Sequence, residues 1–200
     1  YRGARMSIII FGASTTYGKE DPSQGWVQRL RTLIEKKRRL NIYNLGIPGQ
    51  TSMDILKRFS DEIKQRLGTE NWIIIEMGTN DSRCDADNTI EINERRFKKN
   101  IKNIIREAKS FTENVIMIGP SKVEETKTSP FKGHYYKNEN IKKYNYIMQE
   151  HANSNKIRFF DIFDADIKTV DGLHPTSQEH EKRAKKISGI ILGEENPIDR

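Results

Sequence analysis

The chain has a single cysteine and no long apolar run, and both features narrow the class of protein to which it can belong. Cys84 is the one cysteine among 200 residues, so no disulfide can form within the chain, which is typical of a reducing compartment. No motif places a base beside this thiol, so an incidental cysteine is the better interpretation. The longest apolar runs, such as Ile8–Phe11, are as short as a β-strand and far below the length of a membrane span. The N-terminus has no basic segment followed by an apolar core, so we expect no secretory signal and a cytoplasmic location.

Metal-binding patterns are also missing. The four histidines are dispersed along the chain and, with the lone cysteine, offer no zinc-ligand spacing. Asp161, Asp164 and Asp166 lack the glycine and the closing glutamate of a calcium loop. We therefore expect no metal ion and no cofactor.

The glycines near the start of the chain do not form a nucleotide-binding loop. A P-loop needs four residues between its glycines and a serine or threonine after its lysine. Here five residues separate Gly12 from Gly18, and Lys19 is followed by Glu20. No Gly-x-Gly-x-x-Gly segment occurs either, so binding of a dinucleotide by that route is not expected.

Positive charge exceeds negative charge, with 35 lysines and arginines against 28 acidic residues and a net charge of +7. A basic domain can bind nucleic acid or an anionic surface. Here the basic residues spread along helices, as in Glu35–Arg39 and Lys182–Lys186, and acidic residues interleave with them. No aromatic spacing indicates a stacking platform. We therefore expect a solvated surface and no nucleic-acid partner, and the oligomeric state stays open.

Strand-like apolar runs alternate with amphipathic helical stretches. The predicted strands are Ser7–Phe11, Asn41–Leu45, Trp72–Met77, Val115–Ile118 and Ile157–Phe160. The predicted helices are Trp26–Lys37, Ser52–Arg66, Ile90–Ser110, Asn138–Asn153 and Ser177–Ile191. This alternation predicts an α/β fold, a three-layer α/β/α sandwich around a five-stranded parallel sheet in the flavodoxin-like order 2-1-3-4-5.

One domain of residues 7–191 accounts for these elements. Residues 1–5 are interpreted as an expression remnant or the start of a trimmed sequence, and residues 192–200 as a C-terminal tail. Two helix starts carry the spacing of a capping box, Asn88 with Glu91 and Thr176 with Glu179.

Polar motifs follow the strands at their carboxyl ends, where ligand sites lie in such sheets. Ser14 follows the first strand, Gly49 the second and Asn80 the third, while Asp171 and His174 precede the last helix. A serine hydroxyl needs a base to become a nucleophile, and an Asp/His pair can supply one. Glycine backbone and an asparagine amide are suitable donors to a developing oxyanion. The segments are therefore expected to meet at one edge of the sheet.

The other histidines are weaker candidates for the base. His151 and His180 lie on predicted helices and are expected to face solvent, and His134 lies in the long loop Gly119–Lys137. Lys122, Lys127, Lys132 and Tyr135 of the same loop could meet an anionic or sugar substrate, although plain loop surface is the better interpretation.

In its order of motifs the chain resembles the SGNH hydrolases, also called the GDSL esterase/lipase family. The resemblance rests on the blocks around Ser14, Gly49, Asn80 and His174 and covers about residues 7–191. It implies a Ser14 nucleophile, His174 as base and then acid, and Asp171 as the residue that orients the imidazole. It also implies an oxyanion hole made by the backbone N–H groups of Ser14 and Gly49 and the amide of Asn80.

The chain departs from that family at one position. The motif Gly-Asp-Ser-Leu reads Gly12-Ala13-Ser14-Thr15 here, so the acid before the nucleophile is missing. We expect this to alter the support of the nucleophile turn more than the chemistry. Two hypotheses stay open: a serine esterase, and a non-catalytic ligand-binding domain derived from the same fold.

The resemblance leaves the substrate open among short acyl esters, acetylated carbohydrates, lysophospholipids, thioesters and aryl esters. The sequence has no long hydrophobic lid, which favours small or polar esters. A small-molecule ester is therefore the expected partner of the site.

Overall fold

Five parallel strands form the centre of the fold, in the order β2-β1-β3-β4-β5 that the sequence predicted. The computed structural model describes residues 5–194. The strands are β1 (Met6–Gly12), β2 (Leu40–Gly46), β3 (Glu70–Glu76), β4 (Val115–Ile118) and β5 (Arg158–Phe160). Because every pairing is parallel, all carboxyl ends meet at one edge of the sheet.

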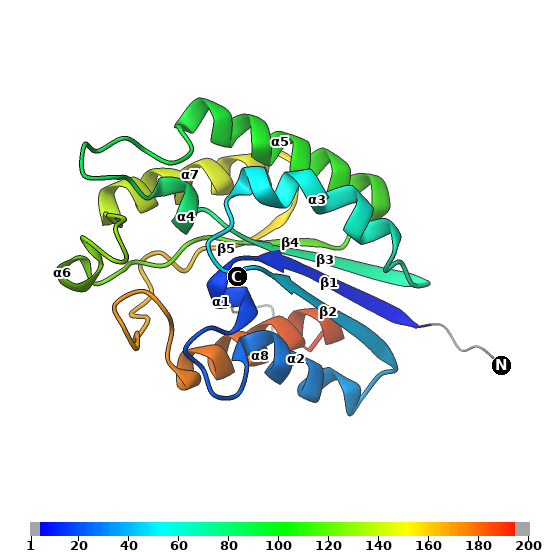
Figure 1. The fold of residues 1–200 in the computed structure, drawn as a ribbon. Coiled ribbons are helices and arrows are strands. Elements are labelled where there is room, and N and C mark those ends of the chain that lie inside the picture. Colours follow the sequence, from blue (N-terminus) through cyan, green and yellow to red (C-terminus); the bar gives the residue numbers. More distant parts are fainter. Residues whose placement is uncertain (1–4, 195–200) are drawn as a thin grey trace.

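Helices cover both faces of the sheet, which confirms the predicted three-layer sandwich (Figure 1). The longer helices are α2 (Gly25–Glu35), α3 (Ser52–Lys64), α5 (Glu94–Phe111), α7 (Asn138–Ser154) and α8 (Ser177–Leu192). Figure 1 shows α3, α5 and α7 above the sheet, and α2 and α8 below it. Three single-turn helices that the sequence analysis did not predict are α1 (Ser14–Tyr17), α4 (Thr79–Ser82) and α6 (Glu125–Thr128).

The apolar run in β1 shows how a central strand of this sheet is buried on both faces. Ile9 and Phe11 belong to the core beneath α3, α5 and α7, whereas Ile8 and Ile10 belong to the core against α2 and α8. All four side chains are completely buried. A strand covered on both faces needs apolar residues at consecutive positions, as parallel sheets generally do.

Both predicted capping boxes are wrong. Helix α5 begins at Glu94 rather than Ile90, and Asn93 caps it by accepting a hydrogen bond from the Arg96 N–H at 3.0 Å. Asn88 instead lies in a turn at φ 63°, outside the helix. Thr176 does occupy the N-cap position of α8, but its side chain makes no capping hydrogen bond.

The predicted domain edges lie close to the ends of regular structure. Strand β1 begins at Met6, and α8 ends at Leu192 with Gly193 as its left-handed C-cap. The predicted remnant and tail otherwise fall on residues 1–4 and 195–200, outside the described residues.

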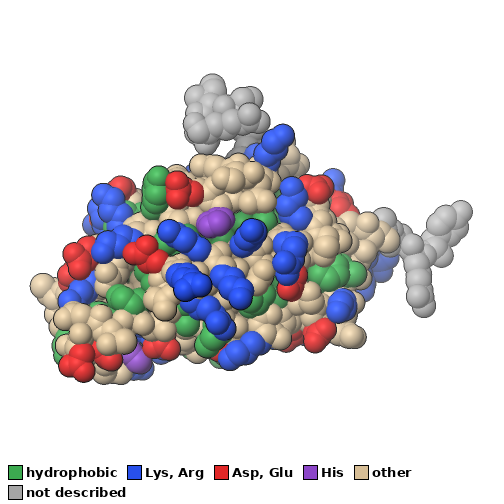
Figure 2. Space-filling view, turned by 90° about the horizontal axis from the view of Figure 1, so that it is seen from above, with side chains coloured by type: hydrophobic (Ala, Val, Ile, Leu, Met, Phe, Trp, Pro, Cys, Tyr) green, Lys and Arg blue, Asp and Glu red, His purple; other side chains and the backbone are tan. Residues whose placement is uncertain are grey.

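Basic side chains gather over the upper helical layer. Figure 2 shows lysine and arginine crowded on the face formed by α3, α5 and α7. The exposed cations of α5 that form no ion pair with another described residue are Arg95, Arg96, Lys98, Lys99, Lys102 and Arg106. The positive charge that was expected to spread along several helices is thus most concentrated on α5. Within residues 5–194, no helix is both long enough and apolar enough to cross a membrane.

Candidate functional site

The predicted site residues lie at the carboxyl edge of the sheet. Ser14 is the first residue of α1, directly after β1, and Asn80 lies in α4, directly after β3. Asp171 and His174 lie in the segment between β5 and α8. Three parts of the chain that are distant in sequence therefore converge where parallel sheets place their ligands.

Ser14, His174 and Asp171 form a continuous hydrogen-bonded row. His174 Nε2 lies 3.0 Å from Ser14 Oγ, and His174 Nδ1 lies 2.7 Å from Asp171 Oδ2. The other Asp171 oxygen accepts from the backbone N–H groups of Leu173, at 3.0 Å, and His174, at 2.8 Å. The His174 side chain is only 2% exposed, so the imidazole at the centre of the row is shielded from water. This is the geometry that activates a serine hydroxyl.

The carboxylate decides which ring nitrogen carries the proton. Partial burial alone would raise the pKa of Asp171, but the hydrogen bonds from His174 and Leu173 hold that pKa below its usual value. An ionised carboxylate only accepts, so Nδ1 of His174 must donate to it. Nε2 is then free to accept the Ser14 proton.

Asn80 lies beside this row with its amide held in one orientation. Its Nδ2 donates to the Gln50 carbonyl at 2.9 Å, and its Oδ1 accepts from the Tyr136 hydroxyl at 3.3 Å. Because a carbonyl only accepts, the nitrogen must face Gln50 and the oxygen must face Tyr136. One amide hydrogen stays available, and Asn80 lines the same cavity as Ser14.

That cavity is small, with a volume of about 40 Å³. Besides Ser14 and Asn80, its lining includes Gln50, Pro120, Val123 and Leu173. Gly49 does not line it, although its neighbour Gln50 does; Gly49 lies in an exposed turn at φ 84°. The structure thus brings Ser14, Asn80, Asp171 and His174 into one region and places Gly49 at its margin.

A buried carboxylate supports the helix that carries Ser14. Glu76, the last residue of β3, accepts from the Thr16 hydroxyl at 2.5 Å and from Trp26 Nε1 at 3.3 Å. It also pairs with Arg183 of α8. Gly12 makes this possible, since a Cβ there would lie 1.9 Å from the Thr16 hydroxyl oxygen. In this chain, where Ala13 stands before Ser14, the helix of the nucleophile is therefore supported by an acid from a different strand.

A second buried carboxylate joins the loops after β2 and β3. Asp81 Oδ1 accepts from the Ser52 backbone N–H at 2.9 Å and from its hydroxyl at 2.5 Å. Asn100 of α5 in turn donates to the Ser52 hydroxyl at 2.9 Å. Burial outweighs these hydrogen bonds and raises the pKa of Asp81 to about 6. Asp81 thus holds the first residue of α3 against the helix that carries Asn80.

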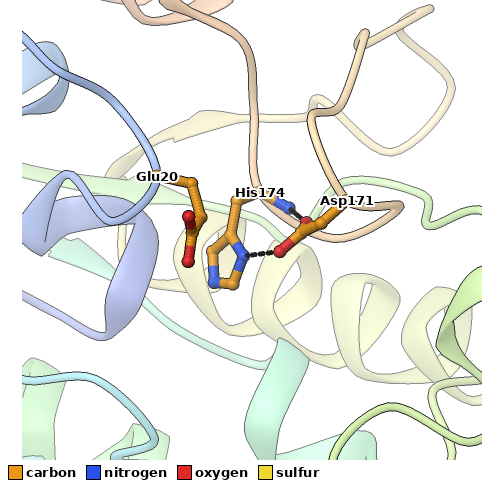
Figure 3. Close-up of side chains that lie close together, drawn as sticks. All are labelled: Glu20, Asp171 and His174. Atoms are coloured by element: carbon orange, nitrogen blue, oxygen red, sulfur yellow. Dashed lines mark hydrogen bonds and ion pairs between the residues drawn. The ribbon is translucent and has the colours of Figure 1, made fainter.

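Glu20 approaches the row from the loop after α1, and the sequence analysis did not identify it. A Glu20 carboxylate oxygen, a His174 ring nitrogen and an Asp171 carboxylate oxygen all lie within 4.8 Å of one another. Figure 3 shows the Glu20 side chain alongside the imidazole, with Asp171 bonded at its other edge. Because Asp171 already accepts the Nδ1 proton, these three residues are not a free set of metal ligands. No local pattern marks Glu20, since only folding brings it to residues about 150 positions away.

Two lysines of the long loop already have acidic partners. Lys122 pairs with Asp164, and Lys127 pairs with Glu124 at 2.7 Å. These ion pairs support the interpretation of the long loop as ordinary surface for both lysines.

The expected exposure of His180 is wrong. Its side chain is completely buried in α8, and neither ring nitrogen has a hydrogen-bond partner among the described residues. Burial, followed by the nearby Arg183 charge, lowers its pKa to about 4, so the ring is neutral at physiological pH.

Comparison with known proteins gives consistent matches over most of the chain. A family model described as "GDSL-like Lipase/Acylhydrolase family" matches residues 10–182. The solved lipase/acylhydrolase from Enterococcus faecalis has a TM-score of 0.77 and 24% identity, covering 96% of this chain and 97% of that one. A variant of Axe2, an acetyl xylan esterase from Geobacillus stearothermophilus, has a TM-score of 0.72 and 18% identity, covering 97% and 96%. At these identities the two structures show a shared fold.

A sequence relative matches over a shorter stretch. The uncharacterized lipoprotein YqeF of Bacillus subtilis (strain 168) is 29% identical over 108 residues, which are 51% of this chain and 43% of the relative. The match therefore spans less than half of that protein's length.

Proposed function

The chain belongs to the GDSL-like lipase/acylhydrolase family and is an ester-bond hydrolase, and within that class we propose that it cleaves small carboxylic esters through an acyl-Ser14 intermediate. The observation that carries the proposal is the pair of distances at His174, 3.0 Å to Ser14 Oγ and 2.7 Å to Asp171. Both are within the hydrogen-bond range required for proton transfer.

The proposed reaction proceeds in two halves. Ser14 Oγ attacks the ester carbonyl carbon while its proton passes to His174 Nε2. The carbon–oxygen bond to the alcohol then breaks, and the imidazolium returns this proton to the leaving oxygen. Water next attacks the acyl group in the same way, with His174 again as base and then acid, and releases the carboxylic acid. Asp171 holds the ring and stabilises its positive charge in both halves.

The negative oxygen of each tetrahedral intermediate needs hydrogen-bond donors. We assign the backbone N–H of Ser14, the backbone N–H of Gly49 and the remaining amide hydrogen of Asn80 to this role. Support for Asn80 comes from its place in the cavity with Ser14 and from the fixed orientation of its amide. Gly49 has weaker support, because it lies outside the cavity lining and depends on substrate reaching its turn.

The cavity size favours a short acyl group. A volume of about 40 Å³ has room for about three water molecules, since a single water needs roughly 10–15 Å³ on this measure. An acetyl group fits such a space, whereas a long acyl chain does not. Acetyl and other very short acyl esters are therefore the proposed substrates.

Hydrolysis of p-nitrophenyl esters from acetate to octanoate tests the proposal. We expect the acetate to be the best substrate, and Ser14→Ala and His174→Ala each to lose about 10⁴-fold or more in kcat. Ser23→Ala, at an exposed serine in the following loop, is the matched control and retains activity. A fluorophosphonate probe followed by mass spectrometry should label Ser14 in the wild type. Unchanged turnover in a folded Ser14→Ala protein would reject the assignment.

A further inference from the structure

An exposed carboxylate stands beside the proposed catalytic histidine without a partner of its own. Glu20 lies within 4.8 Å of a His174 ring nitrogen, yet no other described residue forms an ion pair or hydrogen bond with its carboxylate. Lys122 and Lys127, by contrast, are neutralised by acidic partners. An exposed carboxylate without a partner among the described residues is thus placed beside the imidazole of His174.

The position of Glu20 is set by the residue that follows it. Asp21 is 8% exposed and pairs with Arg29 of α2. It also accepts from the Gly25 backbone N–H at 2.8 Å and from the Ser177 hydroxyl at the start of α8. The loop after α1 is therefore fastened to α2 and α8 within one residue of Glu20.

The leaving alcohol must come close to this carboxylate. In the proposed reaction, His174 Nε2 gives a proton to the leaving oxygen, which requires a separation of about 2.6–3.2 Å. The alcohol portion therefore lies next to the imidazole and within reach of the Glu20 charge. The small cavity limits the acyl group, whereas Glu20 acts on the alcohol side.

We propose that Glu20 is a specificity-determining residue that favours esters whose alcohol portion carries a positive charge and disfavours anionic ones. The inference rests on the proposed function, because it needs the leaving group beside His174. Lys132 acts in the opposite sense: its Nζ lies 5.8 Å from the Phe131 ring centroid, and that centroid lies 6.1 Å from the His174 ring. Lys19 is adjacent to Glu20 in sequence. Its positive charge weakens the electrostatic field of the Glu20 carboxylate but does not remove it.

Three acetate esters of similar size separate charge from shape. Choline acetate carries a cationic alcohol, 3,3-dimethylbutyl acetate is its neutral isostere, and 2-sulfoethyl acetate carries an anion. A pH-stat gives kcat/KM for each with wild type and Glu20→Gln. We expect the cation-to-neutral ratio to fall about two- to fivefold in the variant and the anion-to-neutral ratio to rise by a similar factor. Glu20→Lys should move both ratios further in the same directions.

Glu113→Gln is the matched control, because it makes the same charge change at an exposed residue just before β4, at the opposite edge of the sheet. It should leave both ratios unchanged. The Glu20 effect should shrink between 20 mM and 0.5 M salt as the charge is screened.

The outcomes distinguish the specificity role of Glu20 from the proposed ester hydrolysis on which it rests. Hydrolysis that depends on Ser14 but shows equal ratios in wild type and Glu20→Gln overturns the role of Glu20 alone. The role of Glu20 is also overturned if the substitution moves the cation-to-neutral and anion-to-neutral ratios in the same direction. It is overturned as well if the effect of the substitution does not change with salt concentration. No Ser14-dependent hydrolysis of any of the three esters overturns both.

Discussion

Arg183 of α8 and Glu76 at the end of β3 form an ion pair beneath the nucleophile helix, with side chains only 10% and 11% exposed. The same carboxylate accepts from Thr16, two residues after Ser14. One buried group therefore connects the segment that carries Ser14 with the helix that follows His174. The relative position of serine and imidazole depends on this connection as well as on the sheet.

Arg183→Leu should destabilise the protein. The substitution leaves the Glu76 charge buried with only the Thr16 and Trp26 donors, and loss of one partner of a buried pair costs about 3–5 kcal/mol. We expect urea denaturation to show a loss near the lower end of that range, because the pair retains slight exposure. Labelling of Ser14 by a fluorophosphonate should also slow.

Lys185→Leu on the same helix is the control for this prediction. Its partner Glu181 lies one turn away, and the two side chains are 64% and 55% exposed. Such exposed pairs contribute little to stability, so no measurable change is expected. Equal stability of the two variants would contradict the assigned role of Arg183.

Tyr136→Phe should lower turnover by loosening the amide of Asn80. The tyrosine hydroxyl is the donor to Asn80 Oδ1 at 3.3 Å. A single neutral hydrogen bond contributes about 1 kcal/mol, so we expect roughly a fivefold fall in kcat with little change in KM. Direct removal of the amide in Asn80→Ala should cost more, about 10²–10³.

Tyr135→Phe provides the comparison for this hydroxyl. Tyr135 is adjacent in sequence and half-buried, and its backbone rather than its hydroxyl bonds to Cys84. It should retain wild-type kcat. A Tyr136→Phe enzyme with normal kcat would show that Gln50 alone orients Asn80.

Patterns local in the sequence were enough to predict the sheet and the Ser14, Asp171 and His174 cluster. Each predicted strand is a short and mostly apolar run, the alternation with helices predicts the layers, and the flavodoxin-like order is the natural one for five strands. Ser14 and His174 were predictable because each lies in a block near a predicted element at the carboxyl edge, and because these blocks resemble those of the SGNH hydrolases. Their hydrogen bonds follow from the convergence of strand ends.

Contacts between distant segments were beyond sequence reasoning. Glu76 reads as the end of an apolar strand, and only the folded chain shows it beneath Thr16. Tyr136 lies in a loop without periodicity, and Glu20 in a turn after a single-turn helix. His180 is different, because a signal was present: it shares the helical phase of Ala184, Ile187 and Ile191, which are all buried. The helical phase of His180 thus predicts its burial, and the exposure expected from its residue type was wrong.

Leu173→Ala should broaden the acyl specificity. Leu173 lines the small cavity beside Ser14, and its truncation adds space for two or three more carbons. We expect the ratio of butyrate to acetate hydrolysis to rise about tenfold, since a buried methylene is worth about 0.8 kcal/mol. Val170→Ala, at a 54% exposed residue of the same segment, should leave the ratio unchanged. No change in Leu173→Ala would mean that the acyl chain lies elsewhere.

Asp81→Asn should change how stability depends on pH. Burial raises the pKa of Asp81 from an ordinary value of 3.8 to about 6. Between pH 3.8 and pH 6 the folded protein binds more protons than the unfolded chain. The contribution of Asp81 to the free energy of unfolding is therefore complete below pH 3.8 and is lost as the pH rises through 6.

The asparagine variant cannot lose this contribution, because its side chain does not titrate while its oxygen can still accept from Ser52. Its stability relative to wild type should therefore improve as pH rises from 4 to 7, by on the order of 2–3 kcal/mol, since each pKa unit corresponds to about 1.4 kcal/mol. Urea denaturation of both proteins across this range measures the difference, and titrations common to both cancel. Asp61→Asn, at an aspartate whose side chain is 87% exposed on α3, should track wild type throughout. A flat difference for Asp81→Asn would mean that Asp81 stays ionised in the folded protein down to its ordinary range, held there by the two Ser52 hydrogen bonds.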